Sequence, residues 1–147
     1  MDKPAVENRG IDDKLFNKVL MQFDSTPACH TMGIRVKYLG QGTAGLTMTV
    51  TKELINSLGV IHGGYVAALA DTAMGYAIIT LGLKVLTLDL NLNYLAPALL
   101  GTELRAEASV LHAGKNTVVS EATLHDSDNK LVSKSRGTFF IARTAKN

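Results

Sequence analysis

The chain contains one long stretch of small and apolar residues, GGYVAALADTAMGYAIITL, which runs from Gly63 to Leu81. The stretch is apolar around nearly its whole circumference, which is typical of a helix buried inside a domain. Its alanines and glycines would allow neighbouring backbone to approach closely. We therefore predict a buried central helix over residues 63–81, with a sheet wrapped around it.

Most of the remaining chain alternates apolar and polar residues, the pattern of half-buried strands. Two such segments, 34–38 and 46–50, precede the predicted helix, and the turn at Gly40–Gly42 indicates a hairpin between them. The four that follow the helix are 86–94, 103–110, 116–126 and 131–142. Short turns between consecutive strands predict antiparallel pairing. In the first of these four, we predict that one face is formed by Leu86, Leu88, Leu90, Leu92 and Tyr94.

A second helix is predicted near the N-terminus, over residues 11–23, with Asp12 as its N-cap. The order helix, two strands, buried helix, four strands indicates an α+β fold, with an antiparallel sheet around the central helix. We predict a single domain, 1–147, in which 1–33 is a helical extension and 34–142 is the core. One sheet around one helix leaves an edge uncovered, which favours a homo-oligomer.

Composition and charge argue against several classes of protein. A net charge of +2 and an aromatic content of 5% offer little to nucleic acid. The longest apolar run, 73–83, has 11 residues, too few to cross a membrane. The single cysteine, Cys29, cannot form an intramolecular disulfide and is expected to be buried. We therefore predict a cytoplasmic protein without nucleic-acid or membrane partners.

Candidate catalytic groups lie at the start of the predicted central helix and within it. A helix start offers unpaired N–H groups and the positive end of the helix dipole, and Gly63 and Gly64 place no side chain over these donors. Asp71 is a lone carboxylate in an apolar run, about 12 Å further along the helix. It cannot serve an oxyanion bound at its own helix start. Two copies packed antiparallel could bring Asp71 of one to the helix start of the other.

Several motifs between residues 34 and 142 resemble the PaaI-type acyl-CoA thioesterases of the hotdog fold. They are Asn56-x-x-Gly59-x-x-His62-Gly63-Gly64, Leu69-x-Asp71, the segment Leu86–Asn91, and Tyr94-Leu95-Ala96-Pro97. The spacing from His-Gly-Gly to the aspartate is the most specific of these, and the strand motifs support it. The resemblance implies a hotdog fold and hydrolysis of acyl-CoA thioesters to free acid and coenzyme A.

The resemblance also implies roles for five residues. The Gly63 N–H would polarise the thioester carbonyl, and Asp71 of the facing subunit would act as general base or nucleophile. Asn56 would hold the attacking water or the thioester, and the Thr87 hydroxyl would position water. His62 is expected to orient Asn56 and its loop rather than to transfer protons.

Substrate contacts are expected from two segments, around Tyr94 and around His112. The residues assigned to them are Gly64, Tyr94, Leu95, Ala96, Pro97, His112, Gly114, Lys115 and Asn116. The acyl group is expected to meet Tyr65, Leu69 and Met74 on the helix and Phe16, Phe23 and Met32 of the N-terminal extension. No metal site is predicted, because the histidines lack ligand spacing. We expect no cofactor apart from coenzyme A, which is part of the substrate, and a dimer that forms the site within a tetramer.

Two alternatives remain open from the sequence. The domain could be a non-catalytic module that binds acyl-CoA on the same fold, since a fold does not determine a function. It could also be a hotdog hydratase or dehydratase that uses His62 as its catalytic residue. A variant that removes Asp71 or His62 distinguishes these from the thioesterase.

Overall fold

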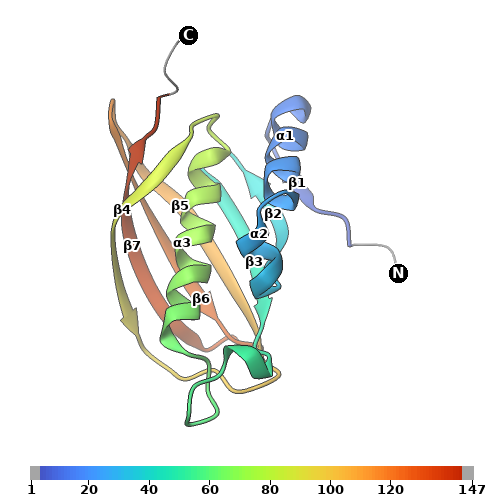
Figure 1. The fold of residues 1–147 in the computed structure, drawn as a ribbon. Coiled ribbons are helices and arrows are strands. Elements are labelled where there is room, and N and C mark those ends of the chain that lie inside the picture. Colours follow the sequence, from blue (N-terminus) through green and yellow to red (C-terminus); the bar gives the residue numbers. More distant parts are fainter. Residues whose placement is uncertain (1–3, 144–147) are drawn as a thin grey trace.

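The computed structural model describes residues 4–143, so both ends of the predicted domain, 1–3 and 144–147, lie outside it. A seven-stranded sheet in the order β1-β2-β3-β5-β6-β7-β4 curves around one long helix (Figure 1). The strands are β1 Glu7–Arg9, β2 Arg35–Gly40, β3 Thr43–Thr49, β4 Val85–Tyr94, β5 Glu103–Ala113, β6 Thr117–His125 and β7 Leu131–Ile141. The helices are α1 Asp13–Asp24, α2 Pro27–Met32, α3 Gly63–Ile79 and the short 3-10 helix η1 Lys52–Leu54. The α+β class and the central helix are as predicted.

The central helix α3 is buried because its apolar side chains, among them Leu69, Met74 and Ile78, pack into one core with those of the sheet. It packs against strands β3 to β7. On β7, a Cβ added at Gly137 would lie 2.9 Å from the Phe139 Cε2 and 3.2 Å from the Asp89 carbonyl oxygen, so a side chain there would force its neighbours to shift. Although α3 is apolar nearly throughout, neither it nor another helix within 4–143 has the length and apolarity needed to cross a membrane.

One edge of the sheet is short and the other is long. At the first edge, the three-residue β1 pairs in parallel with β2, a strand that the sequence did not predict. All other pairings are antiparallel, as expected. At the second edge, the ten-residue β4 pairs with β7 on one side and leaves its other side open in this chain.

The prediction of a single leucine face on β4 was wrong. The register with β7 shifts between Thr87 and Asp89, which is a β-bulge. Leu90 and Leu92 pack against the core, but Leu86 and Leu88, before and within the bulge, are 65% and 60% exposed. Thr87 therefore points towards α3 instead of away from it.

The N-terminal extension holds two helices and packs on α3. As predicted, α1 follows Asp12, whose carboxylate accepts hydrogen bonds from the N–H groups of Lys14 and Leu15. The six-residue α2 was not predicted. Phe23 of α1 meets the Tyr76 ring of α3 edge-on, with ring centroids 5.2 Å apart. Cys29 of α2 is buried as expected, and this burial raises the pKa of its thiol.

Replacing Met74 by alanine is predicted to destabilise the protein by about 2–5 kcal/mol, because the cavity left between α3 and the sheet cannot fully collapse. The matched control is Met21→Ala on α1, where the side chain is 73% exposed and the expected change is below about 0.5 kcal/mol. Urea unfolding followed by circular dichroism measures both. Equal midpoints for the two variants would contradict the close packing of α3 described above.

Candidate active site

The start of α3 carries one N–H donor that the chain leaves open. His62 is the N-cap, and its Nδ1 accepts a hydrogen bond of 2.9 Å from the Gly64 N–H. Among residues 4–143 no group accepts from the Gly63 N–H, which belongs to the first turn. The positive end of the helix dipole lies at the same place and strengthens the attraction of this N–H for negative charge. The arrangement suits a bound carbonyl oxygen or anion.

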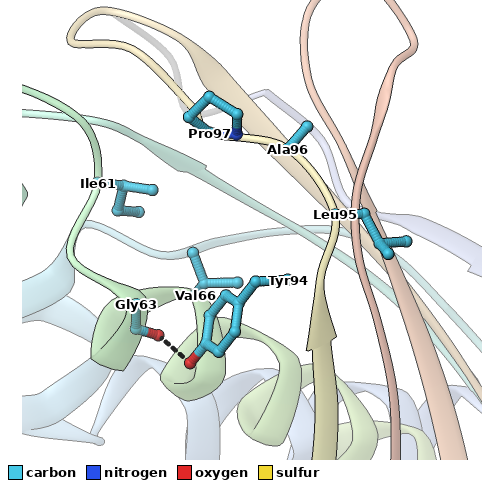
Figure 2. Close-up of a pocket in the computed structure, with 7 residues that line it drawn as sticks. All are labelled: Ile61, Gly63, Val66, Tyr94, Leu95, Ala96 and Pro97. Carbon is cyan, nitrogen blue, oxygen red and sulfur yellow. Dashed lines mark hydrogen bonds between the residues drawn. The ribbon is translucent and has the colours of Figure 1, made fainter.

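Tyr94, the last residue of β4, closes over this helix start. Its hydroxyl donates to the Gly63 carbonyl oxygen at 2.8 Å, and Figure 2 shows the ring lying beside the first turn of α3. A Cβ added at Gly63 would lie 3.2 Å from three atoms of Tyr94, and one added at Gly64 would lie 3.0 Å from the His62 Nδ1. A side chain at either position would therefore crowd Tyr94 or His62, which would have to give way by a few tenths of an ångström.

Two hollows of about 340 Å³ each flank the helix start. The first is lined by Ile61, Gly63, Val66, Tyr94, Leu95, Ala96 and Pro97 (Figure 2). The second lies on the side of α2 and is lined by Met32, His62, Gly64, Tyr65 and Ala68. The structure therefore brings the first predicted binding segment to the open N–H donor. Of the residues expected to meet the acyl group, Met32 and Tyr65 line the second hollow, whereas Phe23, Leu69 and Met74 are buried in the core.

Asp71 lies two turns further along α3 and faces β4. Its Oδ1 accepts a hydrogen bond of 2.7 Å from the Thr87 hydroxyl, and the carboxyl group is half-buried. The β-bulge is what turns Thr87 towards the helix. The structure thus joins two of the predicted catalytic residues, Asp71 and Thr87, by a hydrogen bond. This pair lies about two helical turns from Gly63 of the same chain.

His62 was expected to orient Asn56, and among the described residues no hydrogen bond joins the two side chains. The Asn56 Oδ1 accepts hydrogen bonds from the N–H groups of Leu58 at 2.9 Å and Val60 at 3.3 Å, so its side chain organises its own loop. The His62 ring is engaged by the Gly64 N–H instead. The amide nitrogen of Asn56 accordingly remains available to a ligand, while His62 acts as a helix cap.

The second predicted binding segment lies at the far end of the sheet. The turn that holds Gly114, Lys115 and Asn116 joins β5 to β6, and the Asn116 carbonyl oxygen accepts from the Ile141 N–H at 2.8 Å. Ile141 pairs with Val85, the first residue of β4, whereas Tyr94 is the last. His112, near the end of β5, belongs to the same end as the turn. One chain therefore does not bring the two segments together, and within 4–143 no group of three or more metal-ligating side chains occurs.

A family model described as "Thioesterase superfamily" matches residues 58–133, which include the helix start, Asp71 and the strands β4 to β6. Acyl-coenzyme A thioesterase PaaI of Escherichia coli (strain K12) is 32% identical over 124 residues, covering 84% of this chain and 89% of that protein. The chain belongs to the thioesterase superfamily.

Solved structures of the superfamily share its architecture. The E. coli PaaI structure superposes with a TM-score of 0.87 at 29% identity, covering 91% of this chain and 97% of that one. The structure of smu.793 from Streptococcus mutans UA159 bound to acetyl CoA gives 0.73 at 28% identity, covering 77% and 91%. These likenesses confirm the hotdog fold and the class of thioester hydrolases that the motifs predicted.

Loss of the His62 cap is predicted to cost about 0.5–2 kcal/mol of stability in a His62→Ala variant, because the Gly64 N–H then loses its acceptor. A His62→Asn variant should recover most of the loss, since asparagine is a favourable N-cap. Urea unfolding of the three proteins measures the difference. If alanine and asparagine were equally destabilising, the ring would be acting through packing and not through Nδ1.

Proposed function

We propose that the protein hydrolyses acyl-CoA thioesters to a free acid and coenzyme A, in a site shared by two subunits. The observation that carries the proposal is the open Gly63 N–H in the wall of a hollow, together with a carboxylate on the same helix, Asp71, which Thr87 of β4 holds. The PaaI relative is named an acyl-coenzyme A thioesterase, and the S. mutans structure was solved with acetyl CoA, which supports this class of substrate.

The helix start would bind the thioester carbonyl. As the carbonyl carbon becomes tetrahedral, negative charge develops on its oxygen, and the Gly63 N–H and the helix dipole stabilise that charge. The hollow lined by Tyr94 to Pro97 would take the pantetheine arm of coenzyme A, and the hollow beside Met32 and Tyr65 would take the acyl group. Gly63 lines the first hollow and its neighbour Gly64 lines the second, so the reacting carbon would lie beside these two residues.

Asp71 of the facing subunit would activate the water. Its carboxylate takes a proton from the water as the water oxygen bonds to the carbonyl carbon, and the proton passes to the sulfur as the carbon–sulfur bond breaks. Because the Thr87 hydroxyl holds Oδ1, the Oδ2 atom is left to accept from the water. The Asn56 amide would position that water. Direct attack by Asp71 on the carbonyl is the second route that this geometry offers. Neither route needs a cofactor beyond the coenzyme A of the substrate.

The distances within one chain support a site shared by two subunits. Asp71 lies about 12 Å along the helix from Gly63, beyond the reach of a carbonyl bound there. The open ten-residue β4, with exposed Leu86 and Leu88, is a surface on which a second copy can pair antiparallel. Such pairing would bring the Tyr94 end of one chain towards the turn around Lys115 of its partner. We propose this dimer as the functional unit, assembled further into a tetramer.

An Asp71→Asn variant is predicted to lose about 10²–10⁴-fold in kcat, the usual contribution of a general base. Thiol release from acetyl-, hexanoyl-, decanoyl- and benzoyl-CoA measures the loss and identifies the acyl class. Asp13→Asn, on the exposed face of α1, is the matched control and should keep full activity.

The same panel decides between the proposal and its rivals. Binding of CoA esters without turnover by the wild type would favour the non-catalytic module. Addition of water to an enoyl-CoA, abolished in His62→Ala but retained in Asp71→Asn, would favour the hydratase.

Sharing of the site is predicted to let two inactive variants restore one another. Asp71→Asn and Asn56→Ala subunits, unfolded together at equal amounts and refolded, form mixed dimers with one intact site. Half of the dimers are mixed, so about one quarter of the wild-type activity should return. Each variant refolded alone is the control. No recovery in refolded mixed dimers would show that all the catalytic groups act within one subunit.

A further inference from the structure

Gly63 and Gly64 form a peptide unit that two side chains hold from opposite ends. Its carbonyl oxygen, on Gly63, accepts from the Tyr94 hydroxyl at 2.8 Å. Its N–H, on Gly64, donates to the His62 Nδ1 at 2.9 Å. The two side chains come from different elements, since Tyr94 ends β4 and His62 precedes α3. Rotation of this peptide plane would break both bonds at once.

Such a restraint is needed because the residues on both sides of the peptide are glycines. Glycine has the widest range of backbone conformations, so a Gly-Gly pair in the first turn of a helix is the least rigid support for an N–H donor. The Gly63 N–H lies next to this peptide and has no partner of its own among the described residues. A donor that stabilises developing charge works best when it is already oriented.

We propose that Tyr94 and His62 are positioning residues that orient the Gly63 N–H by clamping the Gly63–Gly64 peptide. This inference rests on the proposed function, in which that N–H binds the thioester carbonyl. The glycines and the clamp depend on one another, because a Cβ at either position would come within 3.2 Å of the Tyr94 or His62 side chain. The two side chains thereby restrict the backbone of Gly63 and Gly64 and hold the neighbouring Gly63 N–H in one orientation.

The clamp also connects the site to the open edge of the sheet. Tyr94 is the last residue of β4, and its backbone pairs with Ser133 of β7. A second copy pairing with β4 would hold this strand in place and thereby the Tyr94 ring. The Tyr94 hydroxyl would therefore link pairing of two copies at β4 to the orientation of the Gly63 N–H.

Tyr94→Phe tests the clamp, since it removes the hydroxyl and keeps the ring. We expect kcat for the best substrate of the panel to fall about fivefold to tenfold while KM changes less than about twofold, because the lost interaction acts on the transition state. Tyr38→Phe on β2 deletes a hydroxyl far from the site and should leave both constants unchanged. A raised KM with unchanged kcat would overturn the proposal, because Tyr94 would then only bind substrate.

The double variant tests whether both side chains hold the same peptide. If either loss already frees the Gly63–Gly64 peptide, His62→Ala combined with Tyr94→Phe should be little slower than the slower single variant. Losses that multiply would show independent roles and contradict the shared clamp.

Amide exchange measured by NMR gives a readout that does not depend on turnover. Exchange of the Gly64 N–H should accelerate about threefold or more in Tyr94→Phe, because the peptide is then held only at its N–H end. Unchanged exchange at Gly64 would refute the clamp even in an active enzyme. If the wild type hydrolysed no CoA ester and Tyr94→Phe still accelerated this exchange, the proposed function would be refuted and the clamp would stand.

Discussion

The functional positions depend on two contacts of one sheet, the packing of α3 against β3 to β7 and the pairing of β4 with β7. Gly137, Ser135 and Ala122 of β6 and β7 are buried, as are the alanines Ala70, Ala73 and Ala77 of α3. The same strand β7 sets the register of β4, pairing Thr87 with Phe139 and Tyr94 with Ser133. Helix and edge strand are thus placed on one common support. This is why Thr87 reaches Asp71 and Tyr94 reaches Gly63.

Patterns of local sequence predicted most of this fold. The central helix was recognisable because apolar residues continue around its whole circumference, and six strands were recognisable from their alternation. What could not be predicted depends on partners distant in the chain. The bulge in β4 exists only in the pairing with β7, and β1 is defined by its pairing with Tyr38–Gly40 of β2. The helix α2 is six residues long, too short to show a helical period before Gly33, whose φ of 70° ends it.

In the candidate site, too, local sequence predicted some features, whereas others depend on residues distant in the chain. Asp71 was evident because an acid in an apolar helix requires a reason, and Gly63 because a helix start exposes N–H groups. The hydrogen bond from Tyr94 to Gly63 spans 31 residues of chain, and no pattern near either residue indicates it. Histidine is an uncommon N-cap, so the role of His62 towards Gly64 was not predicted. Asn56 illustrates the opposite case, since its side chain oxygen serves its own loop and its amide nitrogen is left for other partners.

The two edges of the sheet differ in a way that limits how copies of this chain can add to one another. β1 is three residues long, its Glu7 and Arg9 form an ion pair of 3.1 Å, and the Arg9 guanidinium stacks 3.5 Å from the centre of the Tyr38 ring. Short, charged edges of this kind resist the addition of further strands. A sheet with two long free edges can extend without end into a filament. A sheet with one such edge is complete after a single pairing, so strand addition of the kind proposed for β4 would stop at two copies.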